Sequence, residues 1–222
     1  FVGFVLGLCF MLVLSLVDYH ILSKFYIPAL ILGFLLLIVV LIPGVGISNY
    51  GARRWIGFGP LSFQASEIAK FCFIIFCAGY MSKNVSKMTT FRGTLPVLLS
   101  GGLMCALIML EPNMSITLCV GAVMLVMLLV GGMRPKHLAF CTVPLVGVVP
   151  LLVLLEPYRL KRLFAFVDPW ASPQGEGFQL IQSLYALGAG GWFGVGLFNS
   201  RQKYAFLPFS ESDFIFSIIG EE

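Results

Sequence analysis

The sequence predicts an all-α polytopic membrane protein, and three observations support this fold class. Hydrophobic residues fill 59% of the 222 positions and charged residues only 11%, whereas soluble domains are about a quarter charged. A soluble core of this length could not bury so much apolar side chain, because surface-to-volume scaling limits it. The apolar residues also fall in runs close to the roughly 20 residues that span a bilayer. A soluble domain, a disordered tail and a disulfide scaffold are therefore excluded.

Each apolar run is predicted to be a helix, because backbone polar groups within a bilayer must be satisfied inside the segment. We expect about six full transmembrane helices, at 1–17, 25–43, 64–81, 95–110, 115–131 and 138–155. A seventh is expected to begin near Asp213. The two long connections, 44–63 and about 156–212, are predicted to be loops. Within the second, residues 177–190 are predicted to form an amphipathic helix. Together they would form a single membrane domain over 1–222.

The distribution of lysine and arginine predicts the orientation. One set of alternate loops carries six cations: Lys24, Lys83, Lys87, Arg92, Arg134 and Lys136. The opposite short loops carry only Arg53 and Arg54. Because cytoplasmic loops are enriched in these residues, 44–63 and the large loop 156–212 should be extracytoplasmic. The large loop holds several further cations, and an anionic ligand would explain them on that side.

Cysteines, histidines and net charge exclude some kinds of site. The six cysteines lie inside apolar runs without C-x-x-C spacing, which is typical of small buried hydrophobic residues. Neither histidine belongs to an H-E-x-x-H pattern, so no metal site is predicted. The net charge of +4 is too small to indicate nucleic-acid binding.

The first candidate binding segment combines Arg53, Arg54 and Trp55. Two guanidinium groups beside an indole suit a ligand with a phosphate and a ring, so we take Arg53 and Trp55 as substrate-binding candidates. The alternative is an interfacial anchor, because Trp and Arg commonly lie at the level of the lipid headgroups.

Glu67 and Lys70 are the second candidate pair. They are three residues apart on a predicted helix and so share a face. Both precede unbroken apolar sequence, and ionisable groups at membrane depth face a cavity or a partner. We therefore take both as substrate-binding candidates.

The large loop supplies the remaining binding candidates, which are polar or cationic: Arg159, Arg162, Gln179, Gln182, Ser183, Gln202 and Lys203. Its glycines form no G-x-G-x-x-G or Walker A pattern, so no nucleotide site is predicted. An alternative role for the Arg159–Arg162 cations is contact with anionic lipid headgroups.

Asp213 is the candidate catalytic residue. It lies where the large loop meets the last predicted helix, so that it could face both a polar cavity and an apolar wall. Partial desolvation there would suit a general base. The alternative is that Asp213 or Ser212 only caps the helix.

Taken together, these motifs resemble the SEDS family of peptidoglycan glycosyltransferases (FtsW, RodA and SpoVE), and most closely its FtsW/SpoVE branch. The matching segments, in order, are Gly51 to Ile56, Gln64 with Glu67 and Lys70, Asp168-Pro169-Trp170, Gly177-Phe178-Gln179, Gln182-Ser183-Leu184, Gly190-Gly191 with Gly194 and Gly196, Ser200 with Gln202-Lys203, Leu207-Pro208, Asp213 to Phe216, and Gly220-Glu221-Glu222. Where the family often has Gln-Pro-Asp, this chain has Glu111-Pro112-Asn113.

The resemblance implies an internal fragment of a bacterial, multi-pass cell-membrane protein with about ten helices. It implies polymerisation of lipid II with inversion at the anomeric carbon, in division or sporulation, with Asp213 matching the family's essential aspartate. A class B penicillin-binding protein is the implied partner. No cofactor is expected with certainty, and a divalent cation is an open option. Two alternatives are a lipid-linked precursor flippase or transporter, and a non-enzymatic division scaffold.

Overall fold

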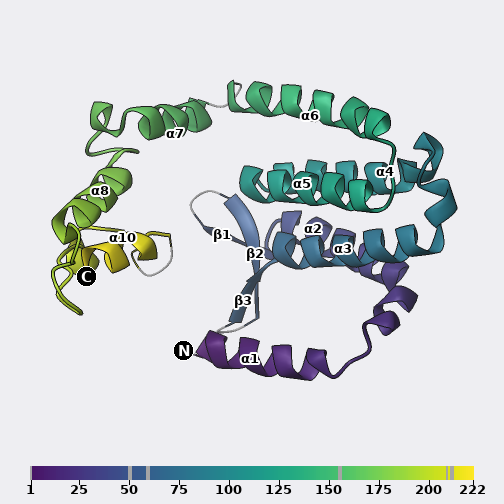
Figure 1. Ribbon diagram of the computed structural model, residues 1–222, viewed down its shortest axis with the longest axis horizontal. Helices are drawn as coiled ribbons and strands as arrows, with labels where there is room; N and C mark the ends of the chain where they lie inside the picture. Colours follow the sequence, from purple (N-terminus) through teal and green to yellow (C-terminus); the bar gives the residue numbers. More distant parts are fainter. Residues whose placement is uncertain (1, 50–51, 59–60, 155–156, 209, 211–212) are drawn as a thin grey trace. The chain divides into compact units, whose positions relative to one another are not determined.

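The computed structural model describes residues 2–49, 52–58, 61–154, 157–208, 210 and 213–222 (Figure 1). The chain divides into two compact units, Phe1–Val143 and Pro144–Glu222, and both are built mainly from helices.

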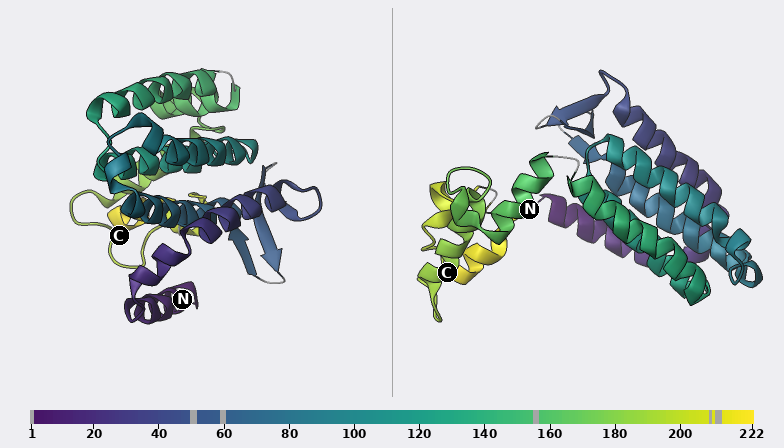
Figure 2. Two further views of the ribbon diagram at one scale, coloured as in Figure 1. Left: turned by 90° about the vertical axis from the view of Figure 1, so that its right-hand side faces the viewer. Right: turned by 90° about the horizontal axis from the view of Figure 1, so that it is seen from above.

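Helices account for most of the first unit, and they coincide with the predicted apolar runs. They are α1 (Val2–Ser15), α2 (Tyr26–Leu41), α3 (Ala65–Lys83), α4 (Phe91–Leu110), α5 (Met114–Val130) and α6 (Pro135–Leu154), with short 3₁₀ turns at Tyr19–Lys24 and Val85–Lys87; α6 continues into the second unit. The views in Figure 2 show α2 to α5 packed side by side. Their core contains Phe73, Met104 and Leu128, all fully or almost fully buried.

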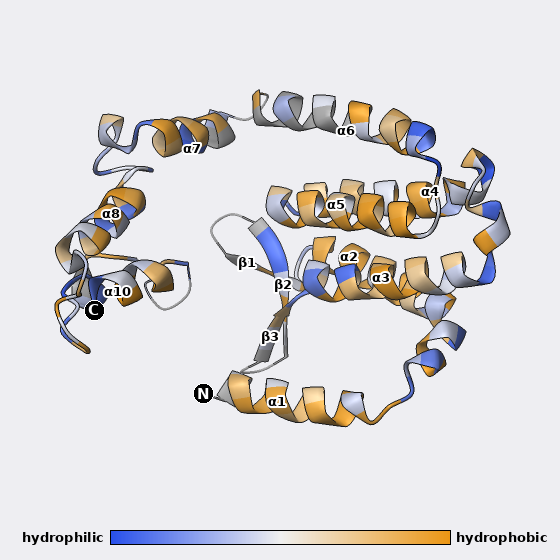
Figure 3. Cartoon of the chain, in the orientation of Figure 1, coloured by the Kyte–Doolittle hydropathy of each residue, from blue (hydrophilic) through white to orange (hydrophobic). Residues whose placement is uncertain are grey.

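The outer faces of these helices are apolar as well as their core. Leu99 and Leu103 on α4 and Val130 on α5 are well exposed, and Figure 3 shows hydrophobic residues along all of these helices. Contiguous exposed apolar surface suits contact with lipid. Within the described residues, α3 and α4 are long and apolar enough to cross a membrane, and α1, α2 and α5 are apolar but shorter. The count of six full spans therefore stays a prediction.

The connection 44–63 corrects the all-α prediction. It forms an antiparallel sheet of β1 (Gly46–Asn49), β2 (Ala52–Phe58) and β3 (Leu61–Gln64), in that order. Ile56 is paired with Phe63 and packs against Val40 of α2 and Ala65 of α3. The segment therefore shares a small hydrophobic core with α2 and α3, which the loop prediction overlooked.

The second unit also contains more structure than the predicted loop 156–212. It comprises α7 (Pro157–Val167), a 3₁₀ turn (Pro169–Ala171), α8 (Phe178–Gly190), α9 (Gln202–Ala205) and α10 (Ile215–Glu221), and α8 packs against α10. The helix predicted at 177–190 is confirmed by α8. The prediction missed α7, although a proline at the first helical position favours a helix start.

Candidate functional site

The three-stranded sheet β1–β3 is called the hairpin below. Its two arginines, both on β2, have different roles in the structure. The Arg54 guanidinium donates hydrogen bonds to the backbone carbonyl oxygens of Glu111 (Nε to O, 3.0 Å) and Pro112. These carbonyls follow the last turn of α4, where unsatisfied oxygens attract cations. Arg53 is exposed, and Trp55 is half-buried. Arg54 therefore anchors the sheet, whereas Arg53 is the guanidinium accessible to a ligand.

The predicted shared face of Glu67 and Lys70 is confirmed. Lys70 Nζ donates to Glu67 Oε2 at 2.7 Å, in the first two turns of α3. The Lys70 side chain is 18% exposed and that of Glu67 is 42% exposed. An anionic ligand approaching this pair would compete with Glu67 for the lysine ammonium, so the pair can exchange an internal contact for a ligand contact.

A buried acid beside the hairpin was not among the predicted site residues. Glu111 is 0% exposed, and neither of its carboxyl oxygens has a hydrogen-bond partner among the described residues. Burial raises the pKa of Glu111 from its ordinary 4.5 to about 7, although the nearby Ser66 hydroxyl and the Arg54 charge oppose the shift. The sequence offered one signal, a carboxylate between an apolar run and Pro112. The same pattern is also typical of a helix end, and α4 does end at Leu110.

Asn113 connects the same region to α3. Its side-chain amide donates to Ser66 Oγ at 3.5 Å, and its side-chain oxygen accepts the backbone N–H of Ile116 at 3.4 Å. Asn113 therefore caps α5, as asparagine commonly does. This role requires a hydrogen-bond acceptor and no charge.

Glu111 should make the protein less stable as the pH rises. Below about pH 4.5 the carboxyl is protonated in the folded and the unfolded chain. Between there and about pH 7 the unfolded chain releases this proton while the folded chain retains it, so stability falls as pH rises and stays lower above pH 7. Glu111→Gln should remove this slope and raise the melting temperature at pH 8 by roughly 5 °C or more.

The measurement is thermal unfolding of the full-length protein in detergent between pH 5 and pH 8. Glu67→Gln is the matched control, because the Glu67 carboxylate is partly exposed and paired, so its removal should leave the slope in place. An equal pH slope in wild type and Glu111→Gln would contradict the assignment.

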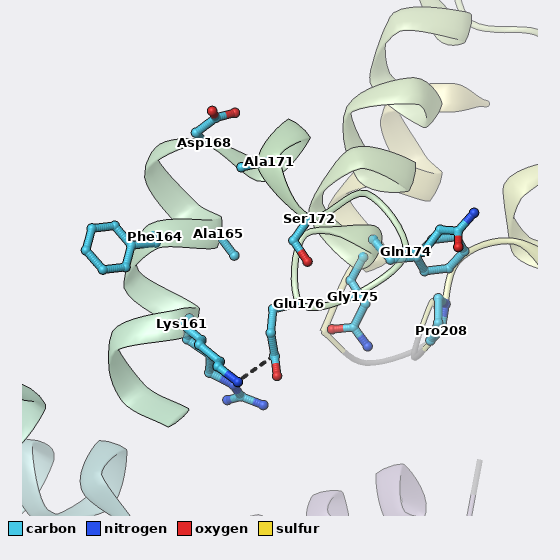
Figure 4. Close-up of a pocket in the computed structure, with 13 residues that line it drawn as sticks. Lys161, Phe164, Ala165, Asp168, Ala171, Ser172, Gln174, Gly175, Glu176 and Pro208 are labelled. Carbon is cyan, nitrogen blue, oxygen red and sulfur yellow. Dashed lines mark ion pairs between the residues drawn. The ribbon is translucent and has the colours of Figure 1, made fainter. Parts of the chain in front are cut away.

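The second unit contains a cleft of about 740 Å³ between α7, the turn that follows it and the start of α8 (Figure 4). This volume is in the range of small-molecule sites. The cleft brings together two predicted residues, Arg162 and Gln179, and adds Lys161, Gln174 and Glu176, which were not predicted. Arg162 Nε lies 3.8 Å from Glu176 Oε2. The lining combines two cations with two carboxylates, Asp168 and Glu176, and with amides and a hydroxyl, so the cleft suits a polar ligand.

Other predicted residues of the second unit are placed differently. Ser183 is buried in the α8–α10 interface, where its hydroxyl lies 2.6 Å from that of Ser217, and Gln182 is half-buried. Lys203 forms an ion pair with Glu222, so its charge is compensated. The side chain of Arg159 lies outside what the structure describes.

Asp213 is exposed two residues before α10. Phe214 occupies the position before the first helical residue, and no side-chain cap is formed there by any described residue. The capping alternative for Asp213 is therefore not supported; Ser212 lies outside the described residues. The described residues also contain no group of three His, Cys, Asp or Glu side chains placed to hold a metal ion.

The class that the fold and site define is a mainly helical protein, in which two described helices are apolar and long enough to cross a membrane, with ionisable groups at the start of α3 and just after α4. The chain belongs to the FtsW/RodA/SpoVE family of cell cycle proteins, whose model matches residues 1–222. The resemblance stated from the motifs is thereby confirmed.

Two curated relatives illustrate the match. The probable peptidoglycan glycosyltransferase FtsW of Saccharophagus degradans is 43% identical over 98% of this chain and 56% of the relative. The stage V sporulation protein E of Bacillus subtilis is 41% identical over 98% of this chain and 60% of the relative. The chain thus spans between half and two thirds of the length of these relatives.

Solved structures agree with the family. A peptidoglycan synthase complex that coordinates polymerization and crosslinking matches 100% of this chain and 61% of its own, with a TM-score of 0.73 and 30% identity. A mutant of the rod shape determining protein RodA of Thermus thermophilus matches 70% of this chain and 48% of its own, with a TM-score of 0.54 and 28% identity.

Proposed function

We propose that the full-length protein containing this chain polymerises lipid II into glycan strands in the cell membrane of a bacterium, in division or sporulation. The observation that carries the proposal is Asp213, an exposed carboxylate without a capping role, in a chain that closely matches relatives named peptidoglycan glycosyltransferases. The other proposed contacts are the exposed Arg53, the Glu67–Lys70 pair and the cleft that holds Arg162 and Gln179.

The proposed glycosyl transfer requires two kinds of group, a base and cations. A base takes the proton from the acceptor sugar hydroxyl, and the resulting oxygen attacks the anomeric carbon of the donor. The bond to the diphosphate breaks on the opposite face, so the configuration inverts. We assign the base to Asp213, because a positioned carboxylate can take this proton. We assign the stabilisation of the departing diphosphate to cations, with Arg53 the best placed in the first unit.

The proposed partner is a class B penicillin-binding protein, which would crosslink the strands that this protein polymerises. Support comes from the structural match to a synthase complex that coordinates polymerization and crosslinking. The exposed apolar faces of α4 and α5 are consistent with a multi-pass location in the bacterial cell membrane.

One observation favours the alternative of a lipid-linked precursor flippase. Glu111 is a buried acid whose pKa of about 7 would let it bind and release protons during a transport cycle. Such a protein would need no base at Asp213.

The decisive experiment supplies fluorescent lipid II to the purified full-length protein together with its partner in liposomes. A ladder of glycan polymers on a gel is the expected result. Movement of the labelled headgroup across the bilayer without polymer would favour the flippase. Absence of both activities would favour the non-enzymatic division scaffold.

A further inference from the structure

Residues 191–207, here called the strap, link α8 to the segment before α10 and pack closely on the end of α10. The backbone N–H groups of Val195 and Gly196 donate to the carbonyl oxygens of Glu221 (2.8 Å) and Glu222 (3.2 Å). A side chain at Gly194 would meet the Glu222 carbonyl at 2.1 Å, and its φ of +72° also favours glycine. The first part of the strap is therefore held by backbone contacts.

The second part of the strap is held by one side chain. Glu221 is only 2% exposed, and its two carboxylate oxygens accept three hydrogen bonds from the strap. Glu221 Oε2 accepts from Ser200 Oγ at 2.5 Å and from the backbone N–H of Gln202 at 3.4 Å, and Oε1 accepts from the backbone N–H of Arg201 at 3.1 Å. Ser200 Oγ in turn accepts the backbone N–H of Lys203 at 3.2 Å.

This network is an N-cap supplied by a different helix. The free N–H groups at the start of α9 need acceptors, and a residue from α10 provides them. Its donors are one hydroxyl and two backbone amides, so the carboxylate fits and an amide would not. A glutamine at this position would retain one acceptor oxygen and direct its NH₂ group at a donor.

The neighbouring Glu222 holds the side chain of Lys203, which belongs to the same turn. It pairs with Lys203 Nζ, and that ammonium also lies over the rings of Phe198 (5.5 Å) and Tyr204 (5.3 Å). α10 thus begins two residues after Asp213, and Glu221 and Glu222 hold Gln202 and Lys203.

We propose that Glu221 is a positioning residue, which holds the turn 200–203 so that Gln202 and Lys203 are presented to the substrate. The proposal rests on the proposed function and adds Gln202 and Lys203 to its substrate contacts, with the Lys203 ammonium exchanging Glu222 for the anionic ligand. The holding of the turn by Glu221 can be tested without any activity.

The first test is limited trypsin digestion of the full-length protein in detergent, with the peptides quantified by mass spectrometry. Cleavage after Arg201 and Lys203 reports the strap, and cleavage after Lys161, which is exposed in the same unit, reports general opening. In Glu221→Gln the ratio of strap cleavage to Lys161 cleavage should rise about tenfold, since the variant loses charge-assisted hydrogen bonds. An unchanged ratio overturns the proposal.

Two further variants serve as a control and as a second readout for this test. Ser217→Ala removes a buried hydrogen bond one turn earlier on α10 and leaves the strap contacts intact, so its ratio should equal that of wild type. Ser200→Ala removes one of the three bonds to Glu221 and should raise the ratio by a smaller factor, which provides a readout if Glu221→Gln does not fold.

The second test measures lipid II polymerisation at varied substrate concentration. Glu221→Gln should raise KM by about tenfold with a smaller change in kcat, because the loss is in presentation of binding groups. A raised cleavage ratio with wild-type KM would overturn the presentation role. Wild-type protein that makes no polymer would refute the proposed function, while the cleavage ratio would still decide whether Glu221 holds the turn.

Discussion

Asp213→Asn in the full-length protein is expected to reduce lipid II polymerisation by about 10²-fold to 10⁴-fold, which is the usual contribution of a positioned base. Asparagine has nearly the same shape as aspartate but cannot take a proton at neutral pH. The measurement is the rate of polymer formation from fluorescent lipid II, with membrane insertion and partner binding followed in parallel.

The structure sharpens this experiment, because it separates catalysis from stability. Phe214 occupies the N-cap position of α10, and among the described residues no side chain caps the helix. A caps-only residue would contribute around 1 kcal/mol to stability. Asp213→Asn should therefore melt at the wild-type temperature, so that a loss of activity reports the reaction itself.

The neighbouring acid provides the control. Glu211→Gln removes a carboxylate two positions away, which on a helix would point to a different side and on an extended segment would share the face of Asp213; Glu211 lies outside the described residues. This control should keep polymerase activity. Retention of most activity by Asp213→Asn would refute the assignment, and loss in Glu211→Gln alone would transfer it to Glu211.

The arginine pair of the hairpin should give two different phenotypes. Arg53→Ala is expected to lower kcat/KM for lipid II by about 10-fold to 100-fold, the usual range for a charge-assisted hydrogen bond to an anion, with an unchanged melting temperature. Arg53 is exposed, so its guanidinium is accessible to a ligand. Arg54→Ala should instead lower the melting temperature, because the carbonyl oxygens of Glu111 and Pro112 lose their donor.

Steady-state kinetics and thermal unfolding of both variants separate these effects. Lysine substitutions serve as the matched controls: Arg53→Lys keeps the charge but loses the planar fork of donors, so it should recover only part of the activity. Wild-type kinetics in Arg53→Ala would place the diphosphate elsewhere. Equal loss of stability in both alanine variants would show that the two arginines share a structural role.

Most of the helices could be predicted from the sequence, because a long apolar run in a bilayer has few alternatives to a helix. α2 and α5 end within a few residues of their predicted limits, and the amphipathic pattern at 177–190 is α8. The hairpin escaped prediction because its strands are short and depend on distant partners. Ile56 is buried in a cluster with Val40 and Ala65, which no local pattern reveals.

The candidate site was predictable in its residue types and less so in its roles. The spacing of Glu67 and Lys70 predicts their ion pair, since helix geometry fixes it. The different roles of Arg53 and Arg54 depend on the contact of Arg54 with the turn after α4, which joins residues more than 50 positions apart. Glu221 and Glu111 were missed as single residues for the same reason, because burial arises from packing and not from local sequence.

The anchoring of the hairpin also has a thermodynamic consequence for ligand binding. β3 continues directly into α3, Arg54 ties β2 to the turn after α4, and Ile56 packs on α2. The backbone that follows Arg53 is thus fixed before any substrate arrives. Its ordering entropy has already been lost in folding, so more of the attraction between the guanidinium and an anion is available as affinity. Loosening Arg54 should therefore weaken substrate binding through Arg53, although Arg54 itself would never touch the substrate.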